Sequence, residues 1–458
     1  MNYDIIIIGS GPGGYVAAIR AAQLGRRVAI VERAEAGGVC LNWGCIPTKA
    51  LVRSAQVYAD CKSAASFGIT VEGDIKPDWQ KIVARERTVA STMNKGVQFL
   101  LKKNNIEFIA GHGRLASPHT VEVEGTSYEA GAVILATGAR PREMPFMPID
   151  GRHVVSSREA LTLPELPESI VIVGSGAIGS EFAYIFATLG VKVTIVEYMP
   201  QIMPLEDEDT AAAMERAFRK LRAKVLTSTT VKQVSVGDDG RCTIEIEGKK
   251  GAETLTADVV LSAVGIKSNI ENIGLEELGI AVERDKIKVD EHFRTSVEGV
   301  YAIGDIIATP ALAHVASAEA IHCVEHICGL SPEPIDYTTI PSCIFTSPEV
   351  ASVGLTERQA REQGIECKVG RFQYTASGKA TAAGERDGFV KLVFDADDKL
   401  IGAHLVGHNV TEMIAEPTLA KRLGVTAHRL ARTIHAHPSM NEAVMEAAEA
   451  ATGAAIHG

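Results

Sequence analysis

Short apolar runs that end in glycine divide the first part of the chain into strands. Ile5–Ile8 form a continuous apolar run, and glycines follow at once. This length and composition are typical of a buried strand. An apolar helix is expected from the glycines to Gly25, and a second strand at Val28–Val31. The order strand, tight turn, helix, strand predicts a βαβ unit over residues 4–33.

The same pattern returns later in the chain. A strand at Ile170–Val173 leads into glycines, a helix and a further strand at Val193–Val196. Period-3.6 spacing puts five apolar residues on one face of this helix: Ile178, Phe182, Ile185, Phe186 and Leu189. The repeat predicts an α/β fold with two Rossmann-like dinucleotide-binding domains.

Prolines and turns mark the expected domain boundaries. A buried strand at 132–138 is followed by residues 139–148, where three prolines predict a linker, and Pro332–Pro334 mark another boundary. We therefore expect a first dinucleotide-binding domain at 1–145 and a second at 146–268. A central segment at 269–335 is expected to complete the first domain, and a C-terminal domain to follow at 336–458. The last domain alternates strands such as Phe389–Phe394 with helices and predicts an α+β oligomerisation domain.

Composition narrows the function classes. The 458 residues are 46% hydrophobic and 22% charged, as expected of a large globular protein. The net charge of −11 argues against nucleic acid or an anionic membrane surface as the main partner. The N-terminus has no basic stretch, and its apolar run is too short for a signal peptide or a membrane span. We expect a cytoplasmic protein with no membrane association.

The two glycine turns carry the residue pattern of nucleotide sites. In each, three glycines permit the turn and the close approach of a pyrophosphate to the helix N-terminus, and an acid 23 positions after the first glycine is placed to bind a ribose. These residues are Gly9, Gly11, Gly14 and Glu32 in the first turn, and Gly174, Gly176, Gly179 and Glu197 in the second. The alternative for either turn alone is a structural glycine turn. An acid at 197 favours NAD over NADP, because it would repel a 2′-phosphate.

Cys40 and Cys45 lie five positions apart in a glycine-rich segment directly after the first βαβ unit. On a regular helix this spacing separates Cα atoms by about 8.6 Å, whereas a disulfide needs about 4.4–6.8 Å. A bridge therefore requires a distorted turn, which Gly37, Gly38 and Gly44 permit. A strained bridge is easily reduced.

Cys323 and Cys328 have the same spacing and serve as an internal comparison. Their predicted helix, from Pro310 to about Cys328, contains no glycine or further proline before its end. They are expected to be unbridged core thiols. The other four cysteines are isolated, and no Cys/His spacing indicates a zinc or other metal site.

The motifs together resemble one family, the flavin-dependent pyridine nucleotide–disulfide oxidoreductases. The resemblance covers essentially the whole chain. It is carried by GSGPGGYVAA at 9–18, GGVCLNWGCIPTKAL at 37–51, ILATGARP at 134–141, VGSGAIGSEFA at 173–183, YAIGD at 301–305, LAH at 312–314, FTSPEVASVG at 345–354 and HAHPSMNEA at 435–443. It implies FAD in the first dinucleotide domain, NAD in the second, and a homodimer formed by the last domain.

The resemblance also assigns roles. Cys40 is implied to be the thiol that exchanges with a substrate dithiol, and Cys45 the thiolate that lies against the flavin. The implied FAD positions are Gly9, Gly11, Gly14, Glu32, Lys49, Gly113, Thr137, Gly138, Asp305, Ala311, Leu312, Ala313 and His314; the implied NAD positions are Gly174, Gly176, Gly179, Glu197, Val231 and Gly265. From the residues alone, Asp305 is either a turn residue or a group that holds a sugar chain.

Two charged residues are candidates near the cysteine pair. Lys49 follows Cys45 by four positions, so on a continuing helix its ammonium would approach the flavin and lower the pKa of the Cys45 thiol. The alternative is a solvated surface lysine. The family pairs this lysine with a glutamate at the position of Glu181, and we expect an ion pair between them.

His437 and Glu442 match the family's base and its carboxylate partner. Oxidising a dithiol requires a group that accepts a thiol proton near neutral pH, as imidazole does. Ser439 and Glu442 also have the spacing of a capping box, so Glu442 has a structural alternative as well as an orienting role. His435 is expected to be structural. The resemblance implies that His437 of one subunit completes the active site of the other.

The implied activity is oxidation of protein-bound dihydrolipoamide with NAD⁺ as acceptor. The implied partners are the lipoyl domains and cores of 2-oxoacid dehydrogenase or glycine cleavage complexes. Alternatives are a disulfide reductase of the glutathione- or mercuric-reductase type, or a redox-inert FAD/NAD-binding sensor. Ile266 and Lys267 replace a more usual arginine-containing pair after Gly265, which leaves the detail of the NAD site open.

Overall fold

A computed structural model describes residues 2–457 of the chain. Contacts divide these residues into two units, each built from three segments. Unit 1 comprises the residues up to Leu51, Trp79–Arg142 and Gly265–Ile335; unit 2 comprises Val52–Asp78, Glu143–Val264 and the residues from Asp336 onward. The chain therefore passes back and forth between the two units, and each core is built from segments that are far apart in the sequence.

Unit 1 is an α/β fold around a mixed sheet. Its elements are β1 (Tyr3–Ile8), α1 (Pro12–Gln23), β2 (Val28–Glu32), α2 (Gly38–Asn42), the start of α3 (Cys45–Ser63), α4 (Trp79–Lys103), β3 (Glu107–Ala110), β4 (Gly113–Ser117), β5 (Thr120–Val123), β6 (Thr126–Leu135), β7 (Ala139–Pro141), β16 (Ile266–Ser268), β17 (Val282–Glu283), β18 (Lys286–Ile287), β19 (Val300–Ala302), the 3₁₀ turn η2 (Gly304–Ile306) and α8 (Ala313–Ile327). The strand order is β3-β2-β1-β6-β5-β4, and β19 also pairs with β6.

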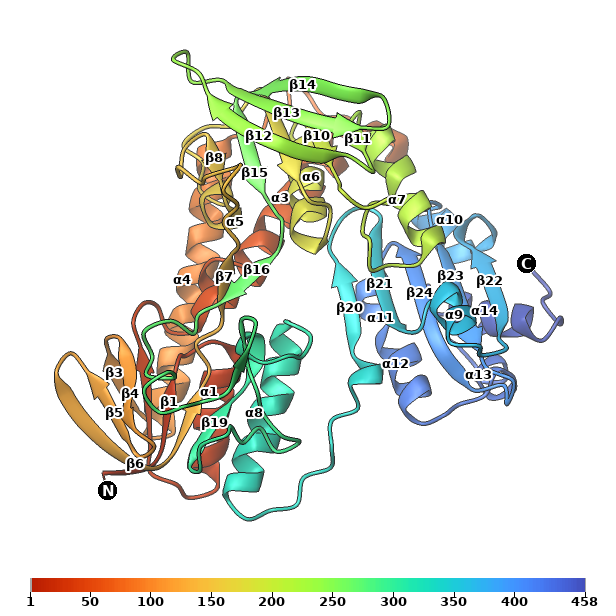
Figure 1. The fold of residues 1–458 in the computed structure, drawn as a ribbon. Helices are drawn as coiled ribbons and strands as arrows, with labels where there is room; N and C mark the ends of the chain where they lie inside the picture. Colours follow the sequence, from red (N-terminus) through yellow and green to blue (C-terminus); the bar gives the residue numbers. More distant parts are fainter. Residues whose placement is uncertain (1, 458) are drawn as a thin grey trace. The chain divides into compact units, whose positions relative to one another are not determined.

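The expected strand at Ile5–Ile8 is the centre of this sheet. Its residues pair in parallel with Val28–Val31 of β2 and with Ala132–Leu135 of β6. All four isoleucines are buried. Helices α1 and α8 lie side by side (Figure 1), and Gly13 of α1 brings the helices into contact near Ala316 of α8. A strand with neighbours on both edges and covered faces needs an uninterrupted apolar run, as the sequence has.

Unit 2 contains a second dinucleotide-type sheet and an α+β domain. Its elements are the rest of α3, the 3₁₀ turn η1 (Ala64–Phe67), β8 (Val154–Val155), α5 (Ser157–Ala160), β9 (Ser169–Val173), α6 (Ala177–Thr188), β10 (Lys192–Val196), α7 (Glu208–Lys220), β11 (Lys224–Leu226), β12 (Thr230–Val236), β13 (Cys242–Gly248), β14 (Gly251–Ala257), β15 (Val259–Ser262), η3 (Tyr337–Thr339), β20 (Pro341–Ile344), β21 (Glu349–Gly354), α9 (Glu357–Glu362), β22 (Lys368–Gln373), η4 (Tyr374–Ala376), α10 (Gly378–Ala383), β23 (Phe389–Phe394), β24 (Leu400–Gly407), α11 (Val410–Met413), α12 (Ala415–Arg422), α13 (Ala427–Ala431) and α14 (Glu442–Ala451).

The parallel sheet of unit 2 repeats the plan of unit 1. Its order is β11-β10-β9-β15-β8, so β9 lies between β10 and β15 as β1 lies between β2 and β6. The antiparallel sheet β20-β21-β24-β23-β22 forms the C-terminal domain with helices α9 to α14 (Figure 1). The expected fold class, two Rossmann-like folds and a C-terminal α+β domain, is confirmed.

Two local expectations are wrong. Residues 139–148 are not only a linker, because Ala139–Pro141 form β7, which pairs antiparallel with β16. Ile178 does not join the buried face of α6. It is 40% exposed, whereas Phe182 and Phe186 are buried. Periodicity could not separate these residues because α6 is buried over most of its circumference. None of the helices within residues 2–457 has the length and hydropathy of a membrane span.

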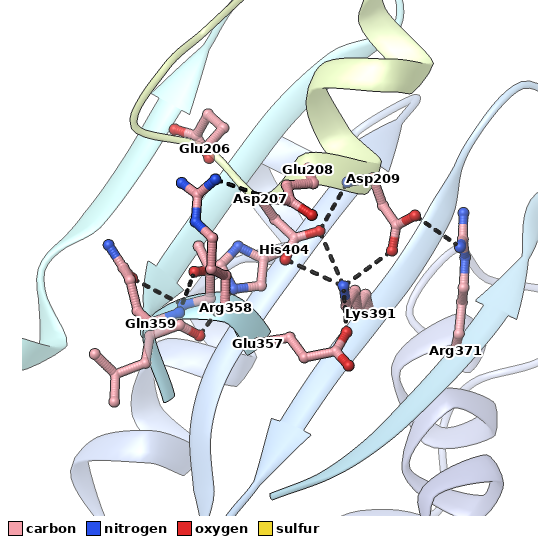
Figure 2. Close-up of polar contacts among 12 residues, drawn as sticks. Glu206, Asp207, Glu208, Asp209, Glu357, Arg358, Gln359, Arg371, Lys391 and His404 are labelled. Atoms are coloured by element: carbon pink, nitrogen blue, oxygen red, sulfur yellow. Dashed lines mark hydrogen bonds and ion pairs between the residues drawn. The ribbon is translucent and has the colours of Figure 1, made fainter. Parts of the chain in front are cut away.

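A buried lysine ties the C-terminal sheet to the start of α7. Lys391 of β23 has a 5% exposed side chain, and its Nζ lies 3.0 Å from Asp207, 2.9 Å from Asp209 and 2.9 Å from Glu357. Figure 2 shows these three carboxylates converging on the ammonium group. Burial alone would lower the pKa of Lys391, but the carboxylates hold it above its usual value. The lysine is therefore a cation inside the core.

Replacing this lysine is expected to destabilise the fold strongly. Lys391→Met removes the cation from the buried Asp207, and breaking a buried ion pair from one side costs about 3–5 kcal/mol. Asp209 and Glu357 keep their contacts with Arg371 and Arg361. The measurement is the free energy of unfolding in urea at neutral pH. Lys368→Met is the matched control, because Lys368 pairs with Asp398 at the surface with a 55% exposed side chain, where such a pair contributes about 0–1 kcal/mol. Equal losses in the two variants would contradict the expectation.

Candidate active site

The first glycine turn, between β1 and α1, requires glycine at two positions for lack of space. Gly9 has a φ of +104°, and a Cβ on it would lie 2.2 Å from the carbonyl oxygen of Ala136. A Cβ on Gly14 would lie 1.9 Å from the carbonyl oxygen of Gly9. A Cβ on Gly11 would meet nothing within 4 Å. Gly9 and Gly14 thus let backbone segments touch, and Gly11 leaves space before the helix.

The second turn, between β9 and α6, has the same division of roles. Gly174 has a φ of +98°, and its Cβ would lie 2.4 Å from the carbonyl oxygen of Ala263. A Cβ on Gly179 would lie 2.0 Å from the carbonyl oxygen of Gly174, and one on Gly176 would meet nothing within 4 Å. The two turns are therefore close copies in geometry as well as in sequence.

In each turn, an acidic residue accepts hydrogen bonds from the serine that follows the first glycine. Glu32 Oε2 accepts hydrogen bonds from the backbone N–H and the hydroxyl of Ser10, at 2.9 and 2.7 Å. Glu197 Oε2 accepts the same pair from Ser175, at 2.9 and 2.6 Å. Sequence reasoning missed both serines, although both stand in a Gly-Ser-Gly tripeptide 22 positions before the acid. The ribose-binding role of the acids stays a prediction.

Helices α1, α6 and α8 begin with backbone donors that no side chain caps. Their N-caps are Gly11, Gly176 and Leu312, and the first turn of each helix contains no acidic residue. The terminal N–H groups and the positive end of the helix dipole favour an anionic group there. With the open space at Gly11 and Gly176, the residues fit the pyrophosphates of two dinucleotides.

Several predicted FAD residues gather at one edge of the unit 1 sheet. Gly9 follows β1, Glu32 ends β2, Thr137 follows β6, and Asp305 follows β19, so all stand at carboxyl ends of neighbouring parallel strands. This edge is where open α/β sheets bind ligands. The Thr137 hydroxyl donates a hydrogen bond to the Asn269 carbonyl at 2.6 Å, which fixes the turn that contains Gly138.

The remaining predicted FAD positions differ in environment. Burial raises the pKa of the Asp305 carboxyl, and the charge of Lys286 lowers it by less. Gly113 is closely packed, because a Cβ there would lie 3.0 Å from Val31 and 3.1 Å from Ile8. Packing alone therefore accounts for glycine at 113. Ala311 to His314 cover the start of α8.

The two remaining NAD positions lie near β12 and β15. Val231 of β12 is buried in an apolar cluster with Val173 and Val196, the last residues of β9 and β10. Gly265 has a φ of +105°, and an added Cβ there would meet nothing within 4 Å. Contact of either residue with a nucleotide stays a prediction.

The two cysteines of the glycine-rich segment lie on different helices. Cys40 is in α2, whose C-cap Trp43 has φ −144° and ψ 19°, and Cys45 is the first residue of α3. Gly44 stands in the break, where a Cβ would lie 3.1 Å from the Val39 carbonyl oxygen. The expected departure from a regular helix is confirmed, with Gly44 as one reason for it.

This segment is packed onto the first glycine turn. Gly37 and Gly38 have φ values of +94° and +61°. A Cβ on Gly38 would lie 2.7 Å from the Cα of Gly11. The Gly37 N–H donates to the carbonyl and the hydroxyl of Ser10, at 3.1 and 3.2 Å. The cysteines are therefore held directly beside the predicted pyrophosphate site.

The structure contains the pair as two thiols that interact with each other. The hydrogen bond with Cys45 raises the pKa of the half-buried Cys40 thiol most, burial raises it further, and the charge of Lys49 lowers it slightly. The Cys40 thiol is therefore hard to ionise beside Cys45. The two sulfurs also differ in exposure, because Cys40 is half-buried and Cys45 is exposed.

Cys323 and Cys328 are unbridged, as expected, but only Cys323 is a core thiol, because Cys328 is half-buried. Both are thiols at the end of the regular helix α8, where Cys323 is fully buried and Cys328 accepts a hydrogen bond from Arg26 at 3.4 Å. Burial raises the pKa of Cys323 well above its usual value, so it is a poor nucleophile. Spacing alone does not make a redox pair.

Glu181 is buried in α6 of unit 2, and its Oε1 accepts a hydrogen bond from the Phe345 backbone N–H at 3.0 Å. Lys49 belongs to unit 1. Their pairing stays a prediction.

His437 and Glu442 form a hydrogen-bonded pair. His437 Nδ1 lies 2.8 Å from Glu442 Oε1, and the His437 side chain is 79% exposed. Partial burial alone would raise the pKa of Glu442, but the Ser439 N–H and His437 hold it below its usual value. Because an ionised carboxylate only accepts, Nδ1 donates, and the lone pair of the neutral ring is on the exposed Nε2. This arrangement suits a proton acceptor.

The capping box expected for this segment is only half formed. The Ser439 N–H donates to Glu442 Oε2 at 2.8 Å, as in a capping box. However, helix α14 begins at Glu442 with Asn441 as its N-cap, and the buried Ser439 hydroxyl has no hydrogen-bond partner within residues 2–457. The reason is that helix α14 begins two residues later than the pattern predicts, with Asn441 instead of Ser439 as its N-cap. In the described part of the chain, no group of three or more His, Cys, Asp or Glu is arranged to hold a metal ion.

Comparison with known families gives two matches that together cover most of the chain. Residues 3–320 match the pyridine nucleotide-disulphide oxidoreductase family, and residues 340–448 match the dimerisation domain of the same family. His437 and Glu442 lie within the second match. The expectation of a C-terminal dimerisation domain is thus confirmed.

Several curated relatives span the full chain. The chain is 46% identical over 466 residues to a dihydrolipoyl dehydrogenase of Zymomonas mobilis, covering 100% of this chain and 99% of the relative. It is 45% identical over 478 residues to a dihydrolipoyl dehydrogenase of Bacillus subtilis, with the same coverage. Among solved structures, LpdA of Mycobacterium tuberculosis is similar with a TM-score of 0.90 and 28% identity, covering 97% of this chain and 99% of that one.

The close contact at the first glycine turn predicts that Gly14→Ala is strongly destabilising. Its methyl group has to displace the Gly9 carbonyl, and such overpacking costs up to about 3 kcal/mol. The check is the melting temperature of the full-length protein. Gly96→Ala is the matched control: it lies in the exposed middle of α4 with nothing within 4 Å, so it should be neutral or stabilising by up to about 1 kcal/mol. A Gly14→Ala protein as stable as the control would refute the assignment.

Proposed function

Because the chain belongs to the pyridine nucleotide-disulphide oxidoreductase family, we propose that it oxidises protein-bound dihydrolipoamide to lipoamide and passes the electrons through FAD to NAD⁺. The observation that carries this proposal is the full-length identity to curated dihydrolipoyl dehydrogenases. The inequivalent pair Cys40 and Cys45 beside the first glycine turn supplies the dithiol centre that such a reaction needs.

The chemistry begins with thiol–disulfide exchange. His437 accepts a proton from one thiol of the substrate, and the resulting thiolate attacks the sulfur of Cys40 in the Cys40–Cys45 disulfide. The S–S bond breaks, and its electron pair leaves on Cys45 as a thiolate. The second substrate sulfur then displaces Cys40, its proton passes to Cys40, and the substrate leaves as a cyclic disulfide. Two electrons have moved from the substrate to the cysteine pair.

Residues around the cysteine pair favour the transfer of electrons away from the substrate. The hydrogen bond with Cys45 and burial raise the pKa of Cys40, which favours the proton on Cys40 in the reduced pair. When bound, FAD supplies a two-electron acceptor for that thiolate and NAD⁺ supplies the final hydride acceptor. Gly9, Gly11 and Gly14 would hold the first cofactor, and the second glycine turn with Glu197 would hold the second. Lys49, paired with Glu181, would place positive charge near the flavin.

Quaternary structure completes the proposal. The family's dimerisation domain contains His437, and we place the base of each active site on the other subunit of a cytoplasmic homodimer. Lipoyl domains of 2-oxoacid dehydrogenase or glycine cleavage complexes would be the macromolecular substrates.

Substrate choice gives the direct test. Purified protein is mixed with lipoamide and NADH, and separately with glutathione disulfide and NADPH. Turnover is expected only in the first mixture, because Glu197 disfavours a 2′-phosphate. Turnover confined to the second mixture would identify a glutathione-type reductase instead, and bound flavin without turnover in either would favour a sensor.

His437→Gln is expected to slow dihydrolipoamide oxidation by about 10²–10⁴ through loss of general-base catalysis. The rate of NAD⁺ reduction measures this loss. His457→Gln is the matched control, because His457 makes a similar contact with Glu446 at 2.6 Å on the same helix but outside the proposed site. Rates equal to those of the control would remove His437 from the mechanism.

A further inference from the structure

The loop that carries His437 has little burial to hold it. Every residue from Arg432 to Pro438 is exposed except His435, and Ile434 is 96% exposed. The nearest apolar anchor after His437 is Met440, which is 5% exposed. Polar contacts therefore have to fix the position of the loop within the chain.

One carboxylate on another helix makes the two key contacts. Glu416 of α12 accepts from His435 Nε2 through Oε1 at 2.7 Å and from Asn441 Nδ2 through Oε2 at 2.8 Å. These partners stand two residues before and four residues after His437. Both ends of the segment are thus fastened to the same side chain.

The hydrogen-bond partners of His435 determine its charge. Its Nδ1 lies 2.8 Å from the Thr433 carbonyl oxygen, and its Nε2 faces Glu416. Both partners only accept when Glu416 is ionised, so both ring nitrogens carry protons. Consistent with this, Glu416 raises the pKa of His435, with a further contribution from Glu442. Burial alone would raise the pKa of Glu416, yet His435 and Asn441 hold it below its usual value.

A doubly donating His435 has no lone pair available for a substrate proton. This distinguishes it from His437, whose Nε2 is exposed. The protonated ring instead holds the loop in place through its hydrogen bond to Glu416. Of the two histidines, only His437 is therefore arranged as a base.

We propose that Glu416 is a positioning residue that sets the location of both His437 and its partner Glu442. Its Oε1 fixes the entry of the loop through His435. Its Oε2 fixes Asn441, the N-cap of α14, which directly precedes Glu442. One side chain thereby holds the base and the carboxylate that orients it. This inference rests on the proposed function of His437.

The test is Glu416→Gln in the full-length protein loaded with flavin. A misplaced base lowers the rate constant with little effect on substrate binding, so kcat for dihydrolipoamide oxidation should fall about tenfold to a hundredfold with KM nearly unchanged. The amide also removes the charge that keeps His435 protonated. Because a raised pKa means that the cation is lost as pH rises, the alkaline decline in rate should move to lower pH.

Two further variants make the result decisive. Glu446→Gln removes the carboxylate of the Glu446–His457 pair on α14 and should leave kcat and the pH profile unchanged. His435→Gln removes the cation while keeping Glu416, so it should reproduce the kcat loss and serves if Glu416→Gln does not fold. Melting temperature and flavin content show whether each variant is intact.

The outcomes separate the two levels of the proposal. If the unaltered protein does not oxidise dihydrolipoamide, the proposed function fails. If the unaltered protein is active and the folded Glu416→Gln or His435→Gln variant keeps its kcat and pH profile within twofold, the positioning role of Glu416 is overturned. A loss of kcat with a shifted profile in those variants, but not in Glu446→Gln, supports it.

Discussion

The contact between Gly38 and Gly11 is the constraint on which the candidate active site depends. No side chain fits on Gly38, because a Cβ there would lie 2.7 Å from the Gly11 backbone. This approach brings the cysteine segment against the same turn that offers its helix N-terminus to a pyrophosphate. Electron transfer needs the cysteine pair and the flavin close together, and a backbone contact provides this without depending on flexible side chains.

Much of this arrangement could be predicted from the sequence. The two βαβ units, the glycines at 9 and 14 and the irregular turn between Cys40 and Cys45 follow from local patterns, because each reflects a steric demand within a short stretch of chain. Ser10 and Ser175 were missed, although their identical placement in two Gly-Ser-Gly tripeptides was a usable signal. The repeat itself would have pointed to them.

Other features depend on contacts that no local pattern records. Lys391 stands in a strand whose residues are all buried, and only the approach of α7 and α9 supplies its three carboxylates. Glu416 resembles any helical surface acid in sequence, yet it joins residues 19 and 25 positions away. The strand at Ala139–Pro141 exists because residues 266–268 return to pair with it. Such residues can be identified only once the chain is folded.

The repeated serine contact anchors a different segment in each of the two folds. In the first fold the hydroxyl of Ser10 accepts from Gly37 at the entrance to the cysteine segment, and in the second the hydroxyl of Ser175 accepts from Met203, each at 3.2 Å. The same serine hydroxyl thus binds the cysteine segment in the first fold and a loop without cysteines in the second. The cofactor turn therefore does not dictate which segment packs against it, and the same geometry can support two different functions in one chain.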